Sequence, residues 1–62
     1  MLSDIKLCEN LNVILNSNEK NYLKICHANG GDFLHYGIEQ ICKKHSLNYE
    51  DVLFYFIHSV MN

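Results

Sequence analysis

The segment IEQICKKHSLNYEDVLFYFI, residues 38 to 57, constrains the fold of this chain more than any other feature. Apolar residues recur every three to four positions on both sides of a short polar break, which predicts two helices joined by a tight turn. Residues 46–48 form the break, and either Asn48 or Ser46 can cap the helix that follows. Glu50 and Asp51 in the first turn suit the positive end of that helix's dipole. The pattern therefore predicts a corner of two packed helices.

Four residues of this segment sit at informative spacings. Cys42 is a small residue where two helices would approach closely, and Ser46 falls in the turn. Leu47 follows as an apolar plug, and Val52 is a β-branched residue for the core. With these residues the segment resembles the helix-turn-helix family, although Ser46 stands where that family usually has Gly. The resemblance implies that a helix over residues 49–61 would lie in the major groove of DNA.

The charges of the last helix point away from that function. Reading bases requires Arg, Lys, Asn or Gln on the exposed side of the helix, whereas this helix offers Tyr49, Glu50, Asp51, Phe54 and Tyr55. The net charge is −2 with histidines neutral, so the chain lacks the excess of positive charge that attracts a polyanion such as DNA or RNA. Nucleic acid is disfavoured, and an antiparallel corner of an all-α domain is preferred. The alternative is a dimeric helix-turn-helix DNA-binding regulator whose Lys43 and Lys44 touch phosphate.

Three further helices are expected, over residues 4–15, 18–28 and 33–45. Ser3 can cap the first, with Leu2 and Leu7 as a hydrophobic staple around that cap. Asn16 followed three residues later by Glu19 resembles a capping arrangement for the second.

The boundaries of the remaining segments follow from turn residues and apolar spacing. Residues 29–31, Asn-Gly-Gly, stop the second helix, and Asp32 can cap the third. Gly37 either lies inside the third helix or marks where a shorter helix begins. A hairpin over residues 12–26 is the competing interpretation, but the helical stripe of residues 5–15 favours helix. The fold class expected is all-α: one domain, residues 1–62, forming a compact bundle of three to four short helices with a helix-turn-helix-like C-terminal corner.

Size and cysteine content indicate how the domain is stabilised and in which cellular compartment it is expected. A core this small rarely supplies more than about 3–5 kcal/mol, so small scaffolds often need a disulfide, a metal or a second subunit. The cysteines are Cys8, Cys26 and Cys42, and their odd number argues against a complete disulfide framework. We expect free thiols in a reducing, cytoplasmic compartment. No signal-peptide pattern is present, and the longest apolar run, residues 52–57, is too short to span a bilayer.

The last helix carries more apolar surface than a small domain easily covers. Its apolar face comprises Tyr49, Val52, Leu53, Phe56, Ile57 and Val60, with Phe54 and Met61 beside it. Tyr55 is expected on the far side, with Asp51 and His58. A helix that is apolar nearly all round must be buried on several sides, so the surplus predicts an interface. The predicted partner-binding residues are Glu50, Asp51, Phe54, Tyr55, His58 and Met61. The alternative is a central core helix packed by the other three.

Chemistry-bearing motifs are weak. Cys42 and His45 form one loose pair and Cys26 and His27 another, whereas structural zinc needs four converging ligands. No nucleophile elbow, phosphate loop or paired carboxylates occur. We therefore expect no metal, no cofactor and no enzymatic activity.

The sequence thus predicts a small protein–protein interaction module with an unidentified protein partner, and a homodimer is one form of this prediction. Its Asn-, Lys- and Ile-rich, proline-free composition often accompanies AT-rich genomes, including phages and other mobile elements. One concrete hypothesis is a modulator of this kind that binds and inhibits a host protein.

Overall fold

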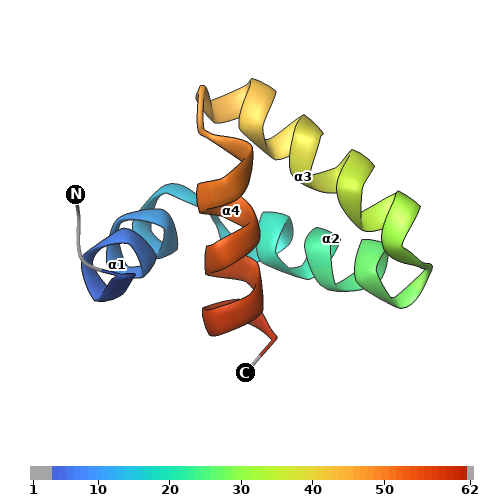
Figure 1. Ribbon diagram of the computed structural model, residues 1–62, viewed down its shortest axis with the longest axis horizontal. Coiled ribbons are helices and arrows are strands. Elements are labelled where there is room, and N and C mark those ends of the chain that lie inside the picture. The colour runs from blue at the N-terminus through green and yellow to red at the C-terminus, as the bar shows by residue number, and fades with distance from the viewer. Residues whose placement is uncertain (1–3, 62) are drawn as a thin grey trace.

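The computed structural model describes residues 4–61, which form four α-helices and one π-helical turn. In chain order these are α1 (Asp4–Ile14), α2 (Ser17–Ala28), α3 (Gly31–His45), α4 (Tyr49–Tyr55) and the π-helical turn η1 (Phe56–Val60), which continues α4 (Figure 1). The all-α bundle predicted from the sequence is confirmed. The alternative of a hairpin over residues 12–26 is wrong, since these residues belong to α1, α2 and the short link between them.

Local capping explains where α2 begins. The Asn16 side chain accepts a hydrogen bond of 2.8 Å from the backbone N–H of Glu19, and the Glu19 carboxylate accepts one of 2.9 Å from the N–H of Asn16. This reciprocal capping box is the arrangement that the sequence predicts. Ser3 and Leu2, predicted as cap and staple for the first helix, lie outside the described residues.

The start of α3 differs from the prediction. Asp32 does not cap this helix: Gly30 is the N-cap residue, no side chain caps the helix, and Asp32 lies within the first turn. Gly30 has φ 125° and ψ 165°, a conformation that L side chains rarely adopt, so glycine is required there. The backbone geometry of glycine, rather than a side-chain cap, thus sets the point where α3 begins.

The corner between α3 and α4 has the predicted form. Ser46 ends α3 in the left-handed conformation, with φ 56° and ψ 47°, at the position where helices usually carry Gly. The N–H of Leu47 donates to the Cys42 carbonyl at 3.0 Å, which closes the end of α3. The Asn48 side chain then caps α4 by accepting 2.9 Å from the N–H of Glu50. Of the two caps considered for the last helix, Asn48 is therefore the one used.

The core lies where α4 crosses the middle of the molecule, with α1 on one side and α3 on the other (Figure 1). Buried side chains from all four helices and η1 meet there: Leu11, Leu15, Leu23, Ile38, Ile41, Cys42, Val52, Tyr55 and Phe56. The inward stripe of the last helix is thus Val52, Tyr55 and Phe56. The core positions expected from the helix-turn-helix spacing, Cys42 and Val52, are both buried, and Leu47 packs against the core.

Tyr55 corrects one prediction. It was expected on the far side of the last helix, yet only 1% of the residue is exposed. Its hydroxyl donates to the Asn12 side-chain oxygen at 3.1 Å, which satisfies the polar end of a buried aromatic ring. Burial, and to a smaller extent Cys8, raises the pKa of Tyr55. Because α4 packs between α1 and α3, its buried stripe includes position 55, and Tyr55 is not available as a surface contact.

Candidate functional site

A shallow groove of about 460 Å³ lies between the N-terminal half of α1 and the end of the last helix. Its lining comprises Asp4, Ile5, Cys8 and Glu9 from α1 with Phe54, His58 and Ser59 from α4 and η1. We call this the α1–η1 groove. Its volume falls within the range of roughly 300–1,000 Å³ typical of ligand sites. The apolar part of its lining is Ile5, Cys8 and Phe54, and Asp4 and Glu9 add carboxylates on its α1 side.

Phe54 and His58 form one wall of the α1–η1 groove. Their ring centroids lie 4.2 Å apart, with 32° between the ring planes. Phe54 is partly buried, and His58 is exposed. Among the described residues, the side chains that pack against the core include Leu53 and Val60 but not Phe54. This aromatic ring therefore contributes to the groove rather than to the core.

The π-helical turn η1 shapes the same wall. The N–H of Met61 donates to the Phe56 carbonyl at 3.0 Å, a bond that spans one residue more than an α-helical bond. The last helix is therefore not regular to its end, although the sequence predicted a single helix over 49–61. Such π-helical turns are frequent at functional sites, and this one carries His58 and Ser59 of the groove.

The predicted partner-binding residues do not form one site. Glu50 is exposed and Asp51 partly buried in the first turn of α4, and Met61 is 50% exposed just after η1. Phe54 and His58 line the groove, and Tyr55 is buried in the core. The structure thus brings two of the six predicted residues into one groove.

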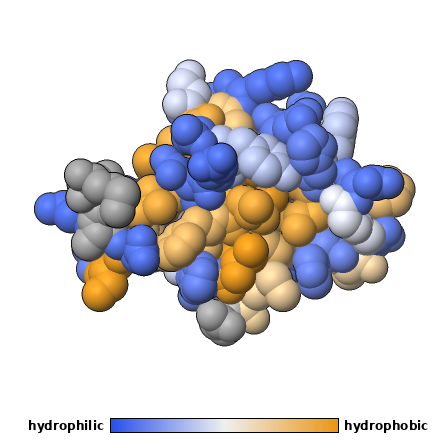
Figure 2. Space-filling model, viewed as in Figure 1, coloured by the Kyte–Doolittle hydropathy of each residue, from blue (hydrophilic) through white to orange (hydrophobic). Residues whose placement is uncertain are grey.

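Sequence reasoning missed the α1 side of the groove. Ile5 begins the apolar stripe of residues 5–15 that the sequence predicts, yet 74% of it is exposed. Asp4 and Glu9 were given no binding role. The signal available in the sequence was the length of this apolar stripe. In the structure Leu11 and Leu15 are buried, whereas Ile5 and Ile14 are exposed, so the other helices cover only part of the stripe. Figure 2 shows apolar side chains gathered across the middle and lower part of the visible face, from α1 over the end of the last helix towards α2.

Charge is distributed unevenly among the helices. The elements α1, α4 and η1 carry four carboxylates, Asp4, Glu9, Glu50 and Asp51, against one lysine, Lys6, so their formal charge is −3. The helices α2 and α3 carry four lysines against three carboxylates, a formal charge of +1. The α1–η1 groove is therefore formed by elements with a net negative charge, and Asp4 and Glu9 line it directly.

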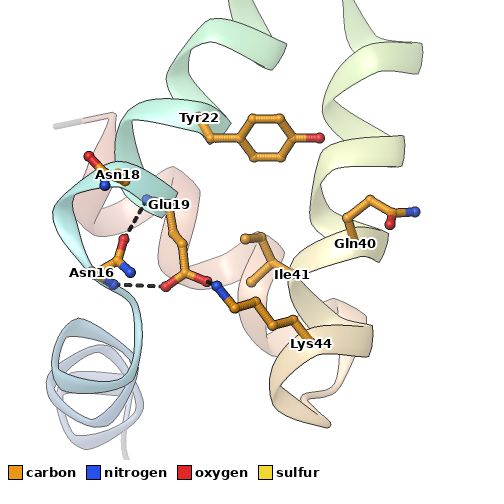
Figure 3. A pocket seen from close by; sticks show the side chains of 7 residues that line it. All are labelled: Asn16, Asn18, Glu19, Tyr22, Gln40, Ile41 and Lys44. Atoms are coloured by element: carbon orange, nitrogen blue, oxygen red, sulfur yellow. Dashed lines mark hydrogen bonds and ion pairs between the residues drawn. The ribbon is translucent and has the colours of Figure 1, made fainter.

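A second groove, between α2 and α3, is lined by Asn16, Asn18, Glu19, Tyr22, Gln40, Ile41 and Lys44 (Figure 3). Its central carboxylate, Glu19, is buried and already bonded. It accepts 2.6 Å from His45 Nε2, and its oxygen lies 3.3 Å from the Lys44 ammonium. Burial raises the pKa of Glu19, but the Asn16 backbone hydrogen bond together with His45 and Lys44 outweighs burial and lowers it. We interpret this cluster as a structural clamp between α2 and α3.

The residues considered for metal binding or catalysis have other contacts. His45 bonds to Glu19, and the His27 ring lies 5.7 Å from the Phe56 ring. All three cysteines are free thiols, as predicted. Burial, with the nearby charges of Glu39 and Asp51, raises the pKa of Cys42, which disfavours the reactive thiolate. Across residues 4–61, no three or more His, Cys, Asp and Glu side chains converge as metal ligands would.

Comparison of the chain with protein-family models, with curated proteins and with solved structures gives no match. Within residues 4–61, each helix is too short or too polar to cross a bilayer. The assignment of a function rests on the geometry and charge of the α1–η1 groove.

Proposed function

We propose that this protein is a small interaction module that binds another protein through the α1–η1 groove. The observation that carries the proposal is Phe54, a large aromatic side chain that lines a surface groove and does not pack against the core. Aromatic residues in partly enclosed sites contribute much of the energy of protein interfaces. The neighbouring apolar side chains Ile5 and Cys8 supply the area that a partner would cover.

DNA binding is the alternative function. The α3–α4 corner favours it, because Cys42, Ser46, Leu47 and Val52 occupy the positions that the helix-turn-helix resemblance assigns to them. The charges oppose it, since the first turn of α4 carries Glu50 and Asp51, and phosphates would repel both. Lys44, one of the two lysines expected to touch phosphate, already pairs with Glu19. Protein binding is therefore the function that the surface supports better.

The proposed interaction module has one concrete biological form. In this form it is a cytoplasmic modulator of a phage or another mobile element that binds and inhibits a host protein. Its support is the small size, the free thiols and the Asn-, Lys- and Ile-rich, proline-free composition that often accompanies AT-rich genomes.

Selection of binders from a displayed peptide library, followed by NMR shift mapping on the labelled protein, tests the proposal. We expect the selected peptides to shift the NMR resonances of Ile5, Phe54 and His58. The substitution Phe54→Ala should weaken peptide binding at least tenfold. Phe33→Ala is the matched control, because Phe33 is an aromatic residue, 59% exposed on α3, that lies outside both grooves.

Two results would contradict the proposal. One is that selected peptides bind equally well to Phe54→Ala and wild type, with the shifts mapping elsewhere. The other is salt-dependent binding of duplex DNA by the wild-type protein, which would favour the alternative function because phosphate contacts release counterions.

A further inference from the structure

We infer, building on the proposed function, that the segment held in the α1–η1 groove is a basic amphipathic α-helix of the partner. Three features of the groove lead to this partner chemistry: the backbone of its walls, the spacing of its side chains and its charge.

The walls of the groove favour a helix over an extended segment. Both walls are helical. Apart from the N–H groups in the first turn of α1 and the C=O groups in the last turn of η1, their backbone groups bond within their own elements, as in the bond from the Met61 N–H to the Phe56 carbonyl. An extended peptide in this groove would find no strand edge among residues 4–61 to pair with its own N–H and C=O groups. A buried backbone group without a partner is costly. A helical segment satisfies its backbone internally and brings only side chains into the groove.

The side-chain spacing fits the same occupant. Ile5 and Cys8 are three residues apart on α1, and Phe54 and His58 are four apart on the opposite wall, so each wall offers one contact per helical turn. A helical segment of the partner also repeats its side chains every three and four residues, so it can meet either wall at these intervals.

The charge selects a basic helix. Asp4 and Glu9 line the groove, and Glu50 and Asp51 add negative charge to the first turn of α4. Within the elements that form the groove, Lys6 is the single lysine against four carboxylates. A partner helix with Lys or Arg beside its apolar stripe would complement this field, which speeds encounter and excludes acidic competitors.

Two designed peptides of about 20 residues test the inference. They share one apolar stripe of Leu at helical spacing and differ only in carrying Lys or Glu at the flanking positions. Binding to the full chain is measured by fluorescence anisotropy at about 50 and about 300 mM NaCl. We expect the Lys peptide to bind at least tenfold more tightly than the Glu peptide and to weaken at high salt.

Variants of the protein locate the contact. The double substitution Asp4→Asn and Glu9→Gln should weaken binding of the Lys peptide about 3- to 10-fold and reduce the salt dependence of this binding. Asp32→Asn is the control, because Asp32 is an exposed carboxylate on α3 outside the groove, and it should change nothing. Phe54→Ala should weaken binding of the Lys peptide because it removes apolar contact area, while the salt dependence of binding should remain.

The outcomes separate this inference from the proposed function. Equal or tighter binding of the Glu peptide, with groove resonances shifted, overturns the basic partner but leaves the groove as the binding site. Absence of Lys-peptide binding up to about 1 mM overturns the inference, and selected peptides that bind the groove as extended chains overturn the helix. A dimer in sedimentation that Phe54→Ala dissociates would place a second copy in the groove and would also overturn it. Groove resonances that respond to no binder would refute the proposed function itself.

Discussion

Replacing Gly37 by alanine tests the closest contact between α2 and α3. The sequence left open whether Gly37 lies inside a helix, and the structure shows α3 running through it without interruption. Gly37 is buried, and a Cβ atom built on it would lie 2.8 Å from Cys26 Sγ and 3.3 Å from Cys26 Cβ. Non-bonded heavy atoms prefer about 3.5–4.0 Å, so a side chain or a helix must move by roughly 1 Å.

Two opposing terms set the size of the effect. Alanine in a helix interior is about 1 kcal/mol more favourable than glycine. Overpacking a filled contact costs about 1–3 kcal/mol. The difference predicts that Gly37→Ala lowers the free energy of unfolding by about 1 kcal/mol, with a range of about 0–2 kcal/mol. The stabilising helix propensity of alanine is therefore hidden by the contact with Cys26.

A double-mutant cycle separates these terms. Cys26→Ala removes the Sγ atom at 2.8 Å and leaves the 3.3 Å contact with the Cβ of residue 26. In that background Gly37→Ala should be neutral or stabilising by up to about 1 kcal/mol, so we expect a coupling energy of about 1–2 kcal/mol. Urea denaturation followed by circular dichroism gives all four free energies by linear extrapolation.

Gly31→Ala is the matched control, since a Cβ at Gly31, in the first turn of the same helix, meets no atom within 4 Å. It should not destabilise the protein. The reasoning would be refuted if Gly37→Ala stabilised the wild-type protein by about 1 kcal/mol, or if the cycle showed no coupling between positions 26 and 37. Either result would mean that α2 and α3 are not in close contact at Gly37.

Three further substitutions test single interactions by the same denaturation assay. Glu19→Gln should destabilise the protein by about 1–2 kcal/mol at neutral pH, because it removes the buried carboxylate that His45 and Lys44 bind. The pKa of Glu19 is lower in the folded than in the unfolded protein. Its ionised carboxylate therefore stabilises the fold above the unfolded pKa of about 4.3, and this contribution is lost as the pH falls through the folded pKa. A difference in free energy of unfolding between variant and wild type that persists in strong acid would contradict this reasoning. Ser46→Gly should stabilise the protein by about 0.5–1 kcal/mol, because glycine adopts the left-handed conformation of this residue without strain, and a loss of stability would mean that the Ser46 side chain makes a compensating contact. Tyr55→Phe should lower the free energy of unfolding by about 1 kcal/mol through loss of the hydrogen bond to Asn12. Unchanged stability together with weakened peptide binding would instead mean that Tyr55 is a surface contact.

The features that the sequence predicts well depend on neighbours in the chain. The Asn16–Glu19 capping box and the Asn48 cap each join residues no more than three positions apart, so their chemistry can be read from spacing alone. The corner between α3 and α4 is similar, because the left-handed residue and the first cap of the next helix follow each other within a few positions. Asp32 shows the limit of this reasoning, since Gly30 starts α3 earlier than a side-chain cap would.

The features that the sequence could not give depend on packing between distant elements. Tyr55 carries a polar group and lies opposite the predicted apolar face, and only the approach of α1, with Asn12 as hydrogen-bond partner, explains its burial. The groove joins residues about fifty positions apart, such as Ile5 and Phe54, and no local pattern relates them. The π-helical turn likewise follows no signal that we identify in the sequence.

Charge shows how the fold changes a conclusion drawn from composition. The chain has a net charge of −2, which by itself excludes little beyond a polyanion. The elements that form the groove, α1, α4 and η1, carry four of the seven carboxylates and one lysine, while α2 and α3 carry the other four lysines. A partner at the α1–η1 groove therefore meets a more negative field than the net charge implies. Since that groove also exposes Phe54 and Ile5, the fold combines negative charge with apolar area, and a basic amphipathic helix is the segment that matches both properties.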